Sequence, residues 1–147
     1  MQKEEILQRL TSKDNKAALE FTKQIVSESM SGNWWYEHFE VFHFLLSHPG
    51  SFVRNRALMI LAALAKWDEN EKFDEMLDDI FKLITDPKPI TSRQCIGSLC
   101  EIGRSKPEYA EKIISAFKNA DVSVYKDSMR NLIEKDITGA IKTLTDK

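Results

Sequence analysis

The chain has 147 residues, of which 42% are hydrophobic and 30% are charged, and its formal net charge at neutral pH is -2. This length and composition are typical of one globular domain with a single core, and they exclude a disordered or collagen-like chain. No apolar run approaches the ~18 residues of a membrane-spanning helix, and we expect the polar N-terminus not to act as a signal peptide. We therefore expect a cytoplasmic protein, and the two cysteines fit a reducing compartment. The nearly neutral net charge predicts no overall attraction to a polyanion or a membrane.

Apolar residues recur with the spacing of amphipathic helices along the whole chain, and no segment alternates as a β-strand does. Glycine and proline are scarce and mostly separate these segments. Pro107, close after Ser105, is typical of the first turn of a helix. The sequence therefore predicts about nine helices, which span approximately residues 2–10, 14–30, 34–47, 51–66, 72–85, 90–104, 106–119, 122–135 and 136–145.

The segments also repeat. A shift of 38 residues places Ala57 on Cys95 and Leu61 on Leu99, and a further shift of 33 places Leu99 on Leu132. Each helix pair leaves an apolar stripe uncovered, so neighbouring pairs must stack to bury it. We expect a single domain over residues 1–147, with three helix pairs at 34–66, 72–104 and 106–135, capping helices in 1–33 and a C-terminal cap in 136–147.

The turns within these pairs carry a family resemblance. Residues 44–58 and 83–96 each combine a leucine-rich first helix, a turn with proline, and small residues that open the second helix. The turn reads Asp86-Pro87 in one stretch and His48-Pro49 in the other. This pattern resembles the HEAT repeat and covers about residues 34–135. The resemblance implies an all-α, right-handed α-α superhelix of the armadillo type, and a function in scaffolding or macromolecular recognition.

In stacks of the HEAT type, the second helix of each pair lines the concave face. Helical projection places a mainly basic set of residues outward on these helices. Such a set is either an ordinary solvated helix face with mixed charges or a site for an acidic protein segment, a nucleic acid or another anion, and the acidic protein segment is the partner we expect. Of the adjacent Trp34 and Trp35 only one is expected to be exposed, and the sequence leaves open which. The predicted partner-binding residues are Arg56, Met59, Lys66, Arg93, Arg104, Lys126 and Arg130, with Trp34 as an aromatic anchor.

The convex face is expected to be acidic. Seven acidic residues lie between positions 68 and 79, and the first of them, Asp68, is expected to open an acidic surface turn. On the helix that follows, the apolar residues are expected to point inward and the acids outward.

The sequence contains no glycine-rich phosphate-binding loop, no Gly-x-Ser-x-Gly elbow and no Cys-x-x-Cys motif. His38, His43 and His48 follow one another at intervals of five, which places them on different sides of a helix, and Cys95 and Cys100 fall at packing positions. We therefore expect no enzyme activity, no metal, no cofactor and no membrane partner.

Two alternatives stay open. One is nucleic-acid binding by a protein related to the alkylpurine DNA glycosylases, which share the HEAT-like architecture. The other is an accessory role in iron-sulfur cluster assembly, with which some short HEAT-like proteins are associated. The oligomeric state is not predicted.

Overall fold

The computed structural model describes residues 1–146, and every regular element in that range is helical, as predicted for the all-α class. Short 3₁₀ helices extend or connect the longer ones: η1 (Trp34–His38), η2 (Leu45–Ser47), η3 (Ala65–Trp67), η4 (Lys82–Thr85), η5 (Pro107–Tyr109) and η6 (Val122–Val124). The eight α-helices of this range are α1 (Lys3–Leu10), α2 (Asn15–Ser31), α3 (Phe39–Phe44), α4 (Ser51–Leu64), α5 (Lys72–Phe81), α6 (Pro89–Ser105), α7 (Ala110–Asn119) and α8 (Asp127–Thr145).

The last helix corrects one prediction. The sequence predicted two helices with a break between residues 135 and 136, but α8 runs without interruption from Asp127 to Thr145. No proline interrupts this stretch, and Gly139 lies inside the helix with open space around the position of its missing Cβ. The prediction of a separate C-terminal cap is therefore wrong for residues 136–145, and its last residue, 147, lies outside the described residues.

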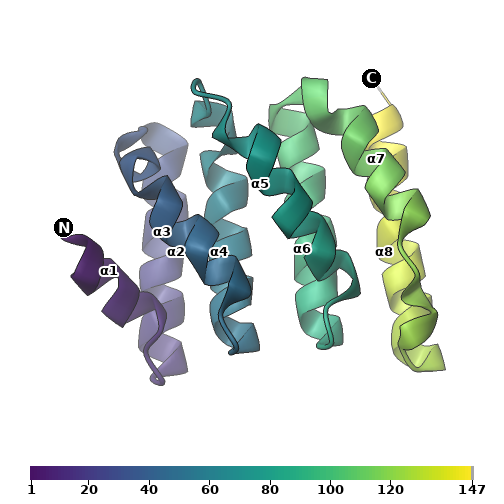
Figure 1. Ribbon diagram of the computed structural model, residues 1–147, viewed down its shortest axis with the longest axis horizontal. Helices are drawn as coiled ribbons and strands as arrows, with labels where there is room; N and C mark the ends of the chain where they lie inside the picture. Colours follow the sequence, from purple (N-terminus) through teal and green to yellow (C-terminus); the bar gives the residue numbers. More distant parts are fainter. Residues whose placement is uncertain (147) are drawn as a thin grey trace.

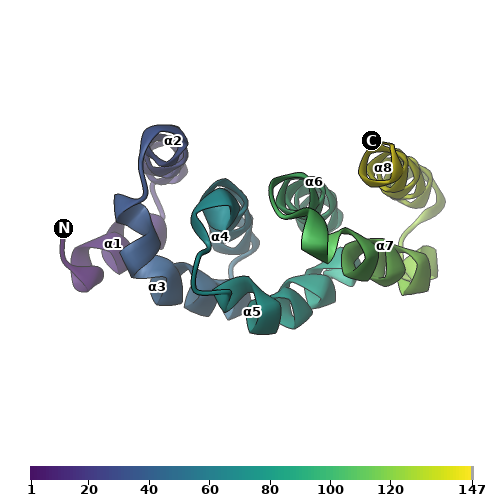
Figure 2. The ribbon, with the colours of Figure 1, turned by 90° about the horizontal axis from the view of Figure 1, so that it is seen from above.

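The helices form two layers (Figure 1). Helices α2, α4, α6 and α8 lie side by side, each in contact with the next, and we call them the inner layer. Helices α1, α3, α5 and α7 cross them obliquely and form the outer layer. Seen from above, both layers curve, and the inner layer lies on the concave side (Figure 2). The second helix of each predicted pair thus lies where the sequence placed it.

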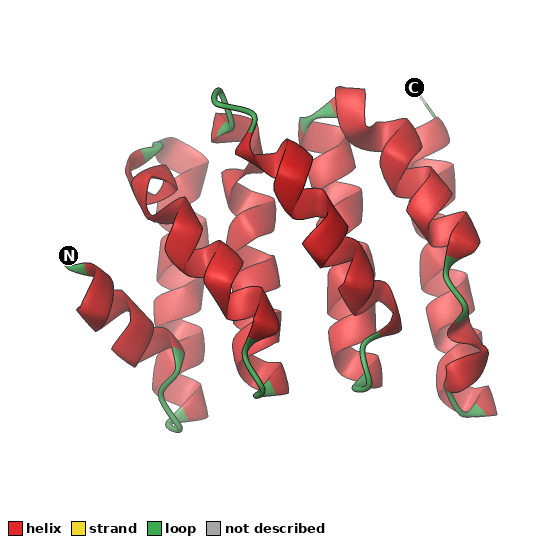
Figure 3. Cartoon of the chain, viewed as in Figure 1, coloured by secondary structure: helices red, strands yellow, loops and turns green. Residues whose placement is uncertain are grey.

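The chain alternates between the layers and makes four helix pairs, α1/α2, α3/α4, α5/α6 and α7/α8. Residues 1–33 were expected to be capping helices, but α2 packs against α4 as the other inner helices pack against one another. The loops that join each outer helix to its inner partner lie along one edge of the molecule (Figure 3), which we call the turn edge. The loops leading to the next pair lie along the opposite edge.

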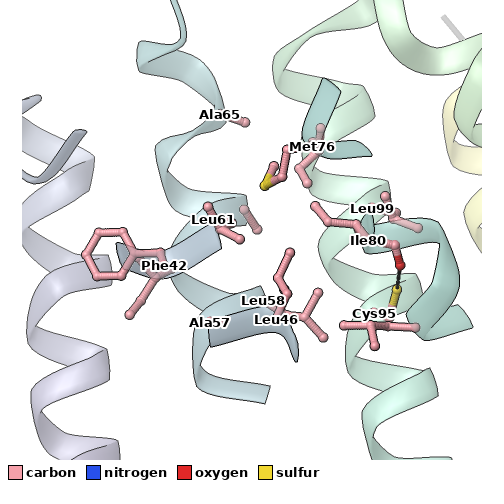
Figure 4. Packing of buried hydrophobic residues seen from close by; sticks show 14 of the residues in the cluster. Phe42, Leu46, Ala57, Leu58, Leu61, Ala65, Met76, Ile80, Cys95 and Leu99 are labelled. Carbon is pink, nitrogen blue, oxygen red and sulfur yellow. Dashed lines mark hydrogen bonds between the residues drawn. The ribbon is translucent and has the colours of Figure 1, made fainter. Parts of the chain in front are cut away.

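The hydrophobic core lies between the layers. Leu61 of α4 and Leu99 of α6 are fully buried, and they pack together with Met76 and Ile80 of α5 (Figure 4). The Cys95 thiol donates a hydrogen bond to the carbonyl oxygen of Ile80 over 3.2 Å, and burial raises its pKa well above the ordinary value. Cys95 therefore occupies a packing position, as the sequence predicts.

A buried ionic contact joins the second pair to the third. Lys106 Nζ lies 2.9 Å from Asp68 Oδ2, and the same carboxylate accepts hydrogen bonds from the Tyr36 hydroxyl and from the backbone N–H groups of Lys72 and Phe73. Asp68 was expected in an acidic surface turn, but it is only 6% exposed. The expectation is wrong because the buried carboxylate accepts the first N–H groups of α5. Its cation, Lys106, comes from a distant part of the chain, where the acidic pattern around Asp68 gives no sign of it.

A second contact lies at the turn edge. Arg54 binds the Asp86 carboxylate with two hydrogen bonds, Nε to Oδ1 and Nη2 to Oδ2, each 2.9 Å long. The Tyr125 hydroxyl donates to the carbonyl oxygen of Asp86 over 2.6 Å. Asp86 is 3% exposed. Its side chain is bound by Arg54 of the preceding helix pair and its carbonyl oxygen by Tyr125 of the segment that leads into α8, so residues from both neighbouring pairs hold this turn.

Candidate interaction surfaces

Three predicted cations and Met59 lie where a partner could reach them without displacing an ion pair. Lys66 in η3, Arg104 near the end of α6 and Lys126 just before α8 are exposed, while Met59 on α4 is partly exposed. None of the three cations forms an ion pair with any of residues 1–146. Lys66 and Arg104 lie close to the ends of two neighbouring inner helices, where a positive charge also complements the helix dipole.

Arg56 corrects the predicted set. It was expected to point outward, but it is only 4% exposed. Its guanidinium donates to the carbonyl oxygen of Leu10 over 2.8 Å and to Asn15 Oδ1 over 2.9 Å. Burial lowers the pKa of Arg56. Through these hydrogen bonds Arg56 joins the first helix pair to the second. The prediction failed because α2 packs on a side of α4 that would be exposed if α4 were considered alone.

Two further arginines are accessible but already paired. Arg93 Nε lies 2.6 Å from Asp136 Oδ2, and the hydrogen bond and charge of Asp136 raise the pKa of Arg93. Arg130 contacts Asp127 at 2.5 Å and Glu134 at 3.8 Å, both on its own helix. A partner would have to compete with these carboxylates, so among the predicted cations of the described residues only Lys66, Arg104 and Lys126 are both exposed and without an ion pair.

The two adjacent tryptophans are now distinguished. Trp34 is 50% exposed and Trp35 is 6% exposed, so Trp34 is the accessible one. Both indole N–H groups donate to Glu28 Oε1, over 3.3 Å from Trp34 and 2.9 Å from Trp35. A Cβ at Gly32 would lie 1.9 Å from the Trp34 ring, so the missing side chain of this glycine makes room for the indole.

The predicted acidic character of the outer layer is partly confirmed. Asp74, Glu75 and Asp78 are exposed on α5, whereas its apolar residues Leu77 and Ile80 are fully buried. Asp68 is the exception described above.

The structure also shows a groove that the sequence analysis missed. It has a volume of about 760 Å³ and lies in the outer layer, between the end of α3 and the end of α5, reaching the turn edge. Phe44 lines it with 67% of its surface exposed. On one wall His43 Nε2 lies 2.7 Å from Asp79 Oδ2. No local pattern reveals this groove, since its walls come from two different helix pairs.

Residues 1–146 contain no group of three or more histidine, cysteine, aspartate or glutamate side chains arranged to hold a metal ion. No helix in this range is both long and apolar enough to cross a membrane. Comparison of the chain with models of known protein families and with curated proteins finds no match in either case.

Proposed function

We propose that the chain is a small HEAT-like solenoid, a right-handed superhelix of four helix pairs, that acts as a non-catalytic interaction module in the cytoplasm. Its partner is a protein with an acidic segment, and the binding surface is the concave side of the inner layer. The alternation of the chain between two curved layers supports the solenoid, and so do the turns that resemble HEAT repeats.

The observation that carries the proposal is the pair of free cations at the ends of adjacent inner helices. Lys66 and Arg104 are separated by 38 residues, which is the sequence repeat, and both are exposed without an ion pair among the described residues. Met59 offers a partly exposed apolar side chain on the same layer. A segment that crosses these helices would meet both positive charges.

Exposed ion pairs contribute only about 0.2 to 1 kcal/mol each. Two or three such contacts give weak binding, so useful affinity requires an apolar anchor as well. Trp34, half-exposed at the end of the first pair, is the aromatic residue best placed for this purpose. Binding is expected to weaken as the salt concentration rises, since the charges are open to solvent.

Affinity capture from a native cell extract tests the proposal. The bait is the wild-type chain, the Lys66→Glu/Arg104→Glu variant, or a control, Lys3→Glu/Lys118→Glu, that makes the same charge change at two exposed lysines outside the inner layer. We expect a protein that is retained by the wild type and the control, lost with the inner-layer variant, and indifferent to nuclease. Equal retention by all three baits contradicts the proposal.

The same experiment tests the nucleic-acid alternative. If nuclease removes the captured material, the polyanion is the partner, and its affinity for duplex DNA should fall with salt by a log-log slope of about -0.9 per phosphate contact.

A further inference from the structure

The groove between α3 and α5 has the form of a binding site. Its volume of about 760 Å³ lies in the range of roughly 300 to 1,000 Å³ that is usual for ligand pockets. The side chains of Phe44, Leu46 and Leu83 and the rings of Pro49 and Pro87 supply its apolar walls. Phe44, the last residue of α3, leaves two thirds of its surface open to solvent.

Most charges in the groove already have partners. Asp79 faces His43 at 2.7 Å and Lys82 at 3.4 Å, and these contacts lower its pKa, with the hydrogen bond from His43 as the largest cause. Arg54 is engaged by the buried carboxylate of Asp86. These groups shape the groove and have little free charge to offer a ligand.

Donors without an acceptor gather at the turn edge of the groove. Lys88 is exposed, and its ammonium forms no ion pair or hydrogen bond with the part of the chain that the structure describes. His48 Nδ1 accepts the backbone N–H of Gly50 over 2.9 Å, so in the neutral ring Nε2 carries the proton and has no partner there. The Lys88 ammonium and the His48 Nε2–H group therefore lie beside the apolar walls without an acceptor among the described residues.

We propose that this groove binds a short protein segment in which a bulky apolar side chain is followed closely by an acidic residue. The apolar side chain packs against Phe44 and Leu83, and the carboxylate pairs with Lys88 and His48. The site lies in the outer layer and is separate from the concave surface of the proposed function.

The charges around the groove favour this occupant over a nucleic acid. Glu40 lines the groove away from the turn edge, and Asp74, Glu75 and Asp78 are exposed along α5. A phosphate backbone would carry its charges past all of these carboxylates. A single carboxylate beside Lys88 avoids them, while the apolar side chain lies against the uncharged walls.

Selection from a displayed library of random heptapeptides tests the proposal. It is carried out against the wild-type chain, Lys88→Glu, Phe44→Ala, and the inner-layer variant Lys66→Glu/Arg104→Glu. We expect the wild type and the inner-layer variant to enrich peptides with an apolar residue next to Asp or Glu. Lys88→Glu should instead enrich Lys or Arg at the acidic position, and Phe44→Ala should weaken binding of the selected peptides at least tenfold.

Both substitutions should leave the fold intact, because Lys88 and Phe44 are exposed. Circular dichroism verifies the helix content of each variant. A charge preference that does not change in Lys88→Glu would overturn the proposal, and so would the absence of any acidic and apolar motif on the wild type. If every selected peptide is lost with the inner-layer variant and none is weakened by Lys88→Glu or Phe44→Ala, the peptides bind the concave surface and the groove proposal is wrong.

Discussion

At the scale of single residues, the contact between Asp68 and Lys106 is the clearest case of a buried charge that holds two helix pairs together. Burial alone raises the pKa of Asp68, but hydrogen bonds from Tyr36 and Lys106 outweigh it and the pKa is lowered. Burial lowers the pKa of Lys106, but the hydrogen bond and charge of Asp68 raise it overall. Folding therefore favours the charged form of both groups.

Replacement of Lys106 by Met leaves the Asp68 carboxylate, whose side chain is fully buried, without its cation. We expect the free energy of unfolding at pH 7 to fall by about 3 to 5 kcal/mol. Urea denaturation measures this change. The matched control, Lys118→Met at an exposed position, should change it by less than about 0.5 kcal/mol, and an equal loss in both variants would show that the buried pair is not stabilising.

The lowered pKa of Asp68 also predicts a pH dependence. The ionised Asp68 carboxylate contributes to the free energy of unfolding, and this contribution is fully present above the pKa of about 4 that the group has in the unfolded chain. It is lost as the pH falls through the lower pKa of the folded state. The free energy of unfolding should therefore decline below about pH 4. Asp68→Asn should make this part of the profile flatter, and an unchanged slope in denaturation experiments between pH 2 and 5 would contradict the prediction.

Lys66 and Arg56 show what a sequence pattern can predict about single side chains. Arg56 lies on α4 and Lys66 lies in η3, which follows α4 directly. The periodicity of the helix predicted over residues 51–66 places both outward. Only Lys66 is exposed, because α2 covers Arg56. Helical periodicity predicts which side of a helix faces its own partner. It cannot predict that a helix of another pair, here α2, buries a residue on the opposite side.

At the scale of helices, the bounds are predicted well where glycine, proline or a capping residue marks them. The predicted segments at 51–66 and 90–104 correspond to α4 with η3 and to α6. The break predicted near residue 135 had no such residue to support it, and α8 continues through it. The groove beside Phe44 could not be predicted, because it forms only when two outer helices lie side by side.

Helices α4 and α8 differ sharply in burial, which gives a test at this scale. Leu61 on α4 is fully buried, whereas Leu132 on α8 is 39% exposed. Leu61→Ala should lower the free energy of unfolding by about 2 to 5 kcal/mol, since it leaves a cavity between the layers. Leu132→Ala is the matched control and should have a much smaller effect in thermal or urea denaturation. Similar losses would show that the core does not lie where the structure places it.

At the scale of the whole molecule, a stack of pairs has two ends that are covered on one side only. Helix α4 has nine buried residues, while the longer α8 has two. Hydrogen exchange of backbone amides should therefore be slowest in α4 and α6 and faster in α1 and α8, where opening needs only one interface to break. Uniform protection along the chain would indicate a closed bundle that unfolds as one unit.

The central claim is that the concave side of the inner layer receives the partner. Its most direct test is photo-crosslinking with p-benzoylphenylalanine placed at Met59 on the inner layer or at Glu75 on the outer layer, in extract that contains the captured protein. We predict a crosslinked adduct from position 59 that disappears when Lys66→Glu and Arg104→Glu are added, and no adduct from position 75. Crosslinking from position 75 alone would contradict the claim and move the binding surface to the other layer.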